Sequence, residues 1–350
     1  EQRARWEPLY EVTQIKGDGE THPLLSPDDA FADYETLALG NLNLTVPKEE
    51  SMLRYEYARQ ALKDGLQMEA ELGANPYKFG MVGSSDTHTA LAAVGEDNYI
   101  GKHAGTEPSP ERWNHPMAKF AGRQYEGYAM ASSGYAAVWA TENTRKALFD
   151  AMKRKEVYAT TGPRMLVRFW GGWDFVEADA NSRLPAAVGY AKGVPMGGDL
   201  STAPDGKSPT FLVAALKDPY GANLDRIQIV KGWMDSKGQT HEKVYDVAWG
   251  DAESRQPGGD GKVPAVGNTV DVKNATWTNT IGDPELITVW TDPDFDAGQK
   301  AFYYTRVIEI PTPRWTAYDA KRFGVEMAKE VEMTTQERAY TSPIWYTPKG

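Results

Sequence analysis

Residues 84–88 read Ser-Ser-Asp-Thr-His and place a carboxylate, Asp86, two positions before an imidazole, His88. They directly follow an apolar run at 79–82. If that run is a buried strand, its period of two directs both side chains to one side at the strand's C-terminal end. Oxygen and nitrogen donors suit Zn²⁺, Mn²⁺ or Fe²⁺. The motif therefore predicts a catalytic and metal-binding pair, and the alternative is an Asp that caps a turn beside a surface His.

Two other segments carry groups that could join this pair. The alternating segment 9–15 predicts a strand, and Glu11 would point inward if its face is buried, or into solvent if it is not. The turn that follows contains Lys16, which could bind an anion, and Glu20, which could bind substrate or a metal. A solvated charged turn is the alternative reading of this second segment.

Hydroxyl and guanidinium groups offer candidate substrate contacts. The hydroxyl of Ser85 could orient metal ligands or receive a substrate oxyanion. Residues 160–164 read Thr-Thr-Gly-Pro-Arg, and Arg164 could bind a phosphate or carboxylate there. A turn that holds a salt-bridged Arg explains the same residues equally well.

Composition excludes several classes of function. The 350 residues include 38 Lys and Arg and 49 Asp and Glu, so the net charge is −11, which argues against nucleic acid as a partner. Cysteine is absent, which excludes disulfides and thiolate ligands, and only five His are present. No apolar stretch has the roughly 18 residues that a membrane span needs. Any metal must therefore be held by His and carboxylates.

The first ~165 residues alternate between strand and helix patterns, which is typical of a parallel α/β layer or barrel. From about residue 166 to 310 the pattern changes to short alternating runs between turn clusters, which predicts an antiparallel β-sandwich-like region. Residues 311–350 would form a return segment to the barrel. The predicted elements of the first part are strands at 9–15, 79–82 and 157–160 and helices at 48–72 and 143–155.

Several phrases of the chain occur together in one known group of proteins. They are Pro-Leu-Tyr-Glu-Val at 8–12, Ile-Lys-Gly-Asp at 15–18, Gly-Ser-Ser-Asp-Thr-His at 83–88, Tyr-Ala-Thr-Thr-Gly-Pro-Arg at 158–164, and the longer runs at 222–228, 309–315 and 336–346. Through them the whole chain resembles the C-terminal part of an uncharacterised bacterial family. That family is related to the PHP (polymerase and histidinol phosphatase) superfamily and to carbaryl-hydrolase-like metallohydrolases.

The resemblance implies a fold and a chemistry. PHP enzymes bind two or three divalent ions at the C-terminal end of a distorted, TIM-like β/α barrel and hydrolyse phosphoesters with a metal-bound hydroxide. Asp86 and His88 match the closing Asp-x-His of that site, and Glu11 matches the family's Glu-Val phrase. Lys16 and Arg164 match phrases near its mouth, as does Glu20. The early His-x-His of such proteins is absent here, so a separate N-terminal fragment would complete the centre.

The combined prediction is a metal-dependent hydrolase that uses one to three divalent ions on a small-molecule substrate. The bond cleaved would be a phosphoester or, alternatively, a carbamate or amide. The competing interpretation is a non-catalytic module that binds glycan or protein on a barrel remnant. Absent cysteine and the signal peptide usual in the family predict a periplasmic or secreted location.

Overall fold

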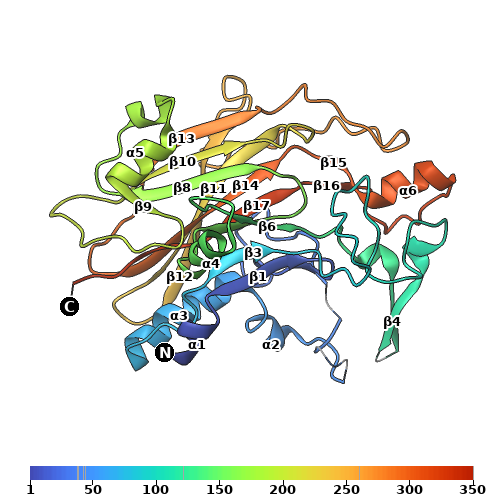
Figure 1. The fold of residues 1–350 in the computed structure, drawn as a ribbon, viewed down its shortest axis with the longest axis horizontal. Coiled ribbons are helices and arrows are strands. Elements are labelled where there is room, and N and C mark those ends of the chain that lie inside the picture. Colours follow the sequence, from blue (N-terminus) through green and yellow to red (C-terminus); the bar gives the residue numbers. More distant parts are fainter. Residues whose placement is uncertain (38, 42, 44, 121, 260, 350) are drawn as a thin grey trace.

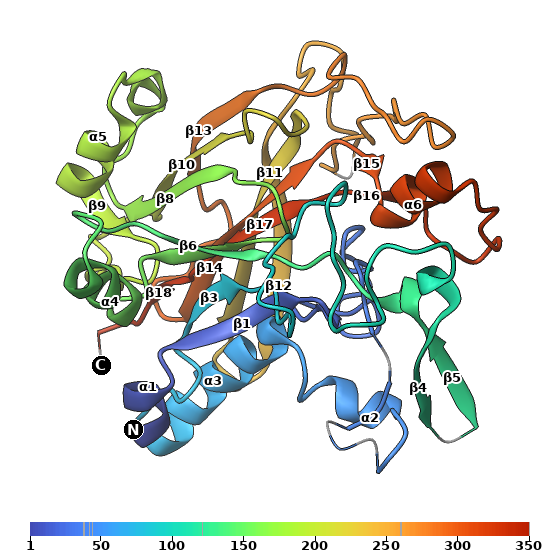
Figure 2. The same cartoon turned by 45° about the vertical axis from the view of Figure 1, so that its right-hand side comes forward.

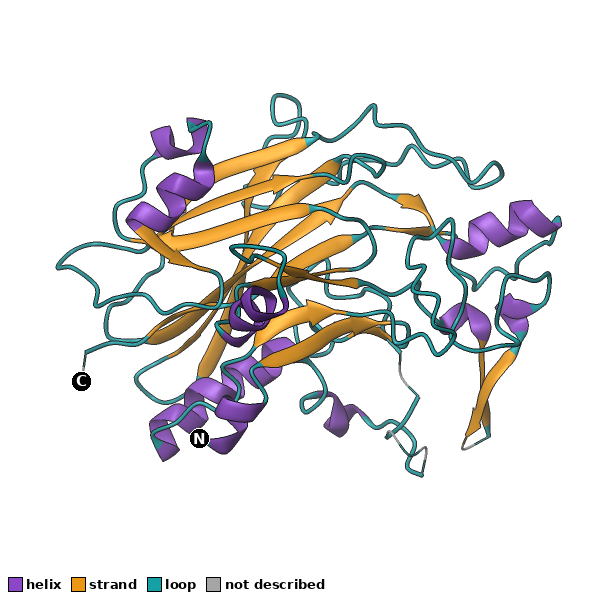
Figure 3. Cartoon of the chain, viewed as in Figure 1, coloured by secondary structure: helices purple, strands orange, loops and turns teal. Residues whose placement is uncertain are grey.

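Strands dominate the computed structural model, which describes residues 1–37, 39–41, 43, 45–120, 122–259 and 261–349 (Figure 3). A seven-stranded sheet with the order β12-β11-β14-β17-β7-β6, to which β18 adds on β14, forms the largest layer. All of its pairings are antiparallel. Its strands are β6 (Tyr135–Val138), β7 (Val157–Thr160), β11 (Leu224–Met234), β12 (Thr240–Trp249), β14 (Lys300–Glu309), β17 (Arg338–Thr341) and β18 (Ile344–Tyr346).

A four-stranded antiparallel sheet with the order β13-β10-β8-β9 covers one face of the larger sheet (Figure 1). Between the two sheets lies the main hydrophobic core, in which Phe169 and Phe211 of the small sheet meet Ile229 and Tyr303 of the large one. Their alternating apolar residues explain this packing, since one face of each sheet must be buried. The strands of the small sheet are β8 (Leu166–Gly172), β9 (Gly193–Pro195), β10 (Thr210–Leu216) and β13 (Glu285–Thr291).

A third, three-stranded sheet with the order β2-β1-β3 lies beside β6, β7 and β17 (Figure 2). It contains β1 (Leu9–Gln14), β2 (Gly17–Asp18) and β3 (Gly80–Gly83). The ladder between β1 and β3 is parallel, and among the strands that the structure describes it is the one parallel ladder. The connection between them includes helix α3 (Ala58–Leu72), which ends at Gly73 in the left-handed conformation that favours glycine.

The remaining elements are short and lie around the sheets. None of the helices in the described part of the chain is long and apolar enough to cross a membrane. These elements are α1 (Gln2–Trp6), α2 (Glu50–Leu53), α4 (Arg145–Lys153), α5 (Pro185–Lys192), α6 (Trp315–Phe323), the 3₁₀ helices η1 (Arg112–Asn114), η2 (Gly127–Ala129) and η3 (Glu177–Asn181), and the two-stranded ladders of β4 (Pro116–Phe120) with β5 (Arg123–Glu126) and β15 (Thr312–Pro313) with β16 (Thr334–Thr335).

The predicted α/β fold with a TIM-like β/α barrel is wrong. The described chain is mostly antiparallel sheet, contains few helices and has no closed barrel. The strand at 157–160 was placed correctly as β7, but it pairs antiparallel with β6 and β17. One sheet takes strands from all three of the segments 1–165, 166–310 and 311–350. Local periodicity identifies a strand but does not give the direction of its partner.

A buried ion-pair network joins the connection between β1 and β3 to the large sheet. Arg59 of α3 bonds to Glu20 and to Asp29, the latter at 2.8 Å. Arg306 of β14 bonds to the same two carboxylates at 2.9 and 2.7 Å. Both guanidinium groups are fully buried. Buried charges of this kind stay stable only as a complete set, because removal of one partner leaves the others unpaired in low dielectric.

Replacement of Arg59 by alanine should therefore lower the free energy of unfolding by about 3–5 kcal/mol. Glu20 and Asp29 would each lose a cation without access to water. Urea denaturation of the purified chain measures this loss. The control is Arg54→Ala, which removes a half-exposed guanidinium that pairs with Asp64 at 3.6 Å and should cost less than about 1 kcal/mol. Equal losses in the two variants would contradict the structural role given to Arg59.

Candidate functional site

The parallel pairing of β1 with β3 brings the 84–88 motif beside the end of β1. Glu11 lies opposite Val82 and Thr13 opposite Gly83, with an irregularity between the two pairs. The backbone N–H of Ser84 then donates to the carbonyl of Thr13 at 3.1 Å. The chain turns at the end of both strands, so the segments that follow meet at one edge of the sheet.

Gly83 allows this strand end to lie close against the large sheet. A Cβ there would meet the carbonyl oxygens of Tyr135 and Thr160, each at 2.8 Å. The N–H of Gly134 donates to the carbonyl of Ser84 at 3.0 Å, which fixes the chain where the motif begins. The position of the motif is therefore set by backbone contacts with β6 and β7.

Asp86 lies at the centre of a compact polar cluster. Its carboxylate accepts hydrogen bonds from the ammonium groups of Lys16, in the β1–β2 turn, and of Lys102, the latter at 2.6 Å. Lys102 also donates to the backbone carbonyl of Asp86 at 3.1 Å. The backbone N–H of His88 donates in turn to the backbone carbonyl of Lys102 at 2.8 Å. Asp86 has φ +48°, a conformation that these reciprocal bonds hold in place.

The two ammonium groups determine the ionisation of this cluster. Burial alone would raise the pKa of Asp86, but hydrogen bonds from Lys102 and Lys16 lower it to about 2. The pKa of Lys102 lies below its ordinary value because of burial and repulsion by Lys16, although Asp86 opposes that shift. One carboxylate therefore lies between two cations, and the cluster carries an excess of positive charge.

Two imidazoles lie at the outer side of the cluster. The Nε2 of His88 is 3.3 Å from a carboxylate oxygen of Asp86, and its side chain is more than half exposed. The ring of His103 meets that of His88 edge-on, with 5.2 Å between centroids. The pKa of His103 is lowered by burial and by the neighbouring His88 and Lys102. The ring nitrogens of both can donate or accept hydrogen bonds, depending on the tautomer.

Glu11 and Ser85 lie near Asp86 but contact other groups. Glu11 is exposed and accepts a hydrogen bond from the hydroxyl of Ser84. The irregularity in the β1–β3 ladder buries both Val12 and Thr13, so the face of Glu11 does not alternate as the sequence predicts. The Ser85 hydroxyl lies 3.3 Å from that of Thr87 and accepts weakly from its N–H at 3.4 Å. The side chains of Ser85 and Thr87 therefore contact each other within the turn of the motif.

Of the other predicted substrate contacts, Glu20 lies elsewhere and Arg164 contacts Tyr135 of β6. Glu20 belongs to the buried network with Arg59 and Arg306, and none of its hydrogen bonds reaches the Asp86 cluster. The guanidinium of Arg164 is exposed and lies 5.6 Å from the centre of the Tyr135 ring. The structure therefore brings together Lys16, Asp86 and His88, with Glu11 close by, and separates Glu20 from them.

Lys102 is the residue that sequence reasoning missed. It lies in a long, irregular loop, 16 positions after Asp86, where no periodicity indicates its direction. The hydroxyl of Thr106 accepts from the backbone N–H groups of Lys102 and His103 and shapes this turn. Gly101 and Gly105, with φ +98° and +96°, are the local signals of a tight turn at this position.

The donor chemistry fits a divalent ion in kind but not in number. An ionised carboxylate and an imidazole lie side by side in Asp86 and His88, as Zn²⁺, Mn²⁺ or Fe²⁺ requires. Within the described residues, however, no group of three or more His, Asp or Glu side chains is arranged to hold a metal. A structural zinc site needs four ligands and a catalytic one three. The described chain offers two beside each other, with Glu11 as a neighbour.

Comparison with known proteins gives one family and no function. A family model described as "Protein of unknown function (DUF3604)" matches residues 1–348. No curated protein and no solved structure matches the chain. The match supports the part of the resemblance that concerns an uncharacterised family, and it does not extend to the PHP superfamily or to carbaryl hydrolases.

Replacement of Lys102 by methionine should raise the pKa of Asp86 from about 2 by about one unit or more, because one of two cationic partners is lost. Carboxyl ¹³C NMR during a pH titration measures this shift. The control is Lys146→Met, which removes a largely exposed ammonium that pairs with Asp150 instead.

The lowered pKa of Asp86 also predicts how the stability of the fold changes with pH. A carboxylate whose folded pKa is depressed stabilises the fold above its unfolded pKa, and this contribution is lost as the pH falls through the folded value. The wild-type chain should thus lose stability from about pH 4 down to about pH 2 more steeply than Lys102→Met. Identical acid profiles and an unchanged pKa of Asp86 would show that Lys102 does not control this carboxylate.

Proposed function

The chain belongs to the DUF3604 family, and we propose that it contributes Asp86 and His88 to the active site of a metal-dependent hydrolase. The proposal depends mainly on one observation, the parallel β1–β3 pairing that gathers Lys16, Asp86 and His88 at the end of two strands. Polar residues at the carboxyl ends of parallel strands are a common location for catalysis. The proposal includes a more distant relation to PHP and carbaryl-hydrolase-like enzymes. It does not include the barrel fold of the PHP enzymes.

Asp86 and His88 would hold the ion, and Glu11 would be a third ligand. Asp86 is ionised at neutral pH, as a ligand must be, because its pKa is about 2. The remaining ligands would come from outside the described residues, for example from an associated N-terminal fragment. A divalent ion supplies Lewis-acid polarisation and lowers the pKa of water at such a site.

The cations of the cluster favour an anionic substrate. Lys16 and Lys102 share the single charge of Asp86, so an incoming anion would be stabilised rather than repelled. The rings of His88 and His103 can donate hydrogen bonds at the outer side. A phosphoester carries such a charge at neutral pH, whereas an amide or a carbamate ester is neutral. Phosphoester hydrolysis is therefore the reaction proposed first, and carbamate or amide hydrolysis second.

The double variant Asp86→Ala/His88→Ala should bind Zn²⁺ or Mn²⁺ at least about tenfold more weakly than the wild-type chain in calorimetric titrations, since both adjacent donors are lost. It should also lose any metal-dependent turnover of a chromogenic phosphoester. The matched control is Asp97→Ala/His115→Ala, which removes an exposed carboxylate and an exposed imidazole elsewhere in the chain. This control should keep the wild-type affinity for both ions.

Two results would count against the proposal. Equal metal affinity in the wild-type chain and both double variants would remove Asp86 and His88 as ligands. Phosphoester turnover that persists in the Asp86→Ala/His88→Ala variant would assign the reaction to other residues. Thermal unfolding of each variant shows whether a loss of binding reflects a loss of fold.

A further inference from the structure

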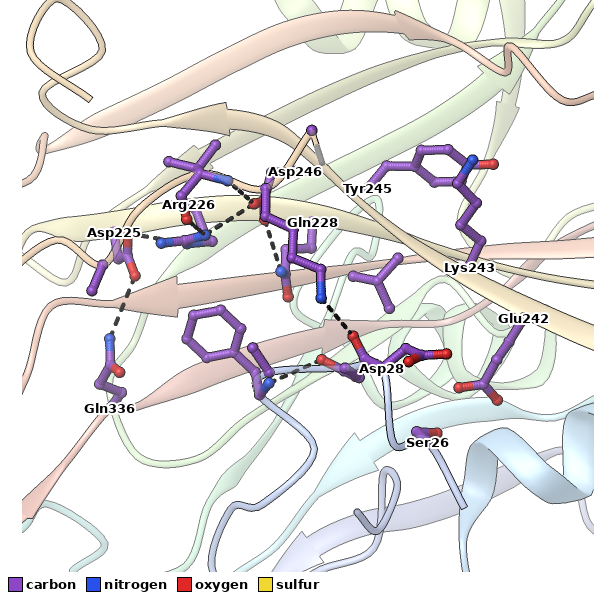
Figure 4. A pocket seen from close by; sticks show the side chains of 18 of the residues that line it. Ser26, Asp28, Asp225, Arg226, Gln228, Glu242, Lys243, Tyr245, Asp246 and Gln336 are labelled. Atoms are coloured by element: carbon purple, nitrogen blue, oxygen red, sulfur yellow. Dashed lines mark hydrogen bonds and ion pairs between the residues drawn. The ribbon is translucent and has the colours of Figure 1, made fainter. Parts of the chain in front are cut away.

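A pocket that shares no residue with the Asp86 cluster lies along β12, the edge strand of the large sheet (Figure 4). We call it the edge pocket. Its volume is about 930 Å³, and its walls come from residues 25–31, from β11 and β12, and from the loop at 261–267. A volume of this size is within the range of small-molecule sites, which lie between about 300 and 1,000 Å³.

The side of the edge pocket nearest α3 is a charge-balanced network. Asp29 pairs with Arg59 and Arg306 at 2.8 and 2.7 Å. Glu242 pairs with Arg59 at 3.0 Å and with Lys63 at 2.6 Å. With Glu20, three carboxylates meet three cations, so the network behind this wall has no net charge. Arg306 and Arg59 also hold the pKa of Asp29 below its ordinary value against the opposing effect of burial, so Asp29 stays ionised at neutral pH.

The opposite wall is balanced in the same way. Arg226 bonds to Asp225 at 3.2 Å and to Asp246 at 2.9 Å, and Arg255 bonds to Asp225 at 2.6 Å. Gln228 donates to a carboxylate oxygen of Asp246 at 2.8 Å. Two carboxylates therefore meet two guanidinium groups. The carboxylate lone pairs that remain can accept further hydrogen bonds from a ligand's hydroxyl groups.

Apolar and aromatic surfaces lie between these polar walls. Phe31, Val244 and Val263 line the pocket, as do Tyr245 and Trp290, whose ring centroids are 4.8 Å apart. Planar polar groups beside aromatic rings suit a ligand that has hydroxyl groups at its edges and C–H groups on its faces. The lining thus combines polar and apolar surfaces and is not predominantly acidic, basic or hydrophobic.

We propose that the edge pocket binds an uncharged saccharide. The three cations that line the pocket already have partners. Arg226 is saturated by carboxylates and by the carbonyls of Val263 and Pro264, Lys243 pairs with Asp294 at 2.6 Å, and Lys262 donates to the carbonyl of Asp28 at 3.2 Å. The balanced walls likewise offer a cation few unpaired carboxylates. A neutral polyol loses less solvation free energy than an ion does, and it gains fixed hydrogen-bond partners and apolar contact with the aromatic rings. The pocket walls are already held by ion pairs, so binding requires little ordering of the protein.

The test is an array of immobilised uncharged, acidic and amino oligosaccharides probed with the labelled full chain. We expect saturable binding to at least one uncharged glycan, followed by titration calorimetry with that glycan. Ala30→Trp and Ala265→Trp should each weaken binding at least tenfold, because both alanines are exposed, line the pocket and can be enlarged into it. The matched control is Ala178→Trp, at an exposed alanine outside the pocket, which should bind as the wild-type chain does.

Three outcomes would overturn the inference while the thermal unfolding profile remains that of the wild-type chain. The first is no binding to any uncharged glycan. The second is binding that both filled variants, Ala30→Trp and Ala265→Trp, retain in full. The third is preference for acidic or amino glycans over every uncharged one. None of these readouts involves hydrolysis, so the result is independent of the function proposed for Asp86.

Discussion

The pairing of Arg59 and Arg306 with the carboxylates of Glu20 and Asp29 is the constraint on which the rest of the structure depends. The two guanidinium groups come from α3 and β14, and the carboxylates come from one segment that leaves β2. Charges buried this completely must be paired. The segment from Glu20 to Asp29 is therefore fixed between a helix and a sheet, together with the β1–β2 turn before it and the edge-pocket wall after it.

The Asp86 cluster is arranged on the opposite principle. Its groups are partly exposed, and two ammonium groups share one carboxylate instead of being matched one to one. A buried network with such an excess would be unstable, whereas at the surface water and a bound anion can offset it. The charges of the Arg59 and Arg306 network are balanced and buried, whereas Lys16, Lys102 and Asp86 are unbalanced and lie nearer the surface.

Local patterns in the sequence were sufficient for several elements. The apolar run before Ser84 is β3, the segment at 157–160 is β7, and α3 ends at Leu72, where the predicted helix ends. Period and turn chemistry are properties of neighbouring residues, so they can be read from the chain. The predicted helix at 48–72 is interrupted, because Tyr57 adopts an extended conformation before α3 begins.

The sequence did not predict which distant strands and side chains contact one another. The barrel prediction was wrong because β7 joins strands from far along the chain, β17 among them, in antiparallel order. Lys102 was missed because its contact with Asp86 depends on the course of an irregular loop. Glu20 was predicted to be an accessible loop carboxylate. It is buried instead, and one of its partners, Arg306, lies 286 positions away in the sequence. Each of these contacts is long-range, and none leaves a trace in local periodicity.

The segment from β1 to Phe31 connects the two proposed sites. It supplies Lys16 to the Asp86 cluster, Glu20 and Asp29 to the buried network, and Phe31 to the edge pocket. Because the network between them is balanced and fully buried, the segment cannot shift at one end without exposing charge at its middle. A ligand in the edge pocket would therefore affect the Asp86 cluster by stabilising the folded chain and not by moving the segment that carries Lys16. It would stabilise the folded chain by mass action and leave the geometry around Asp86 unchanged.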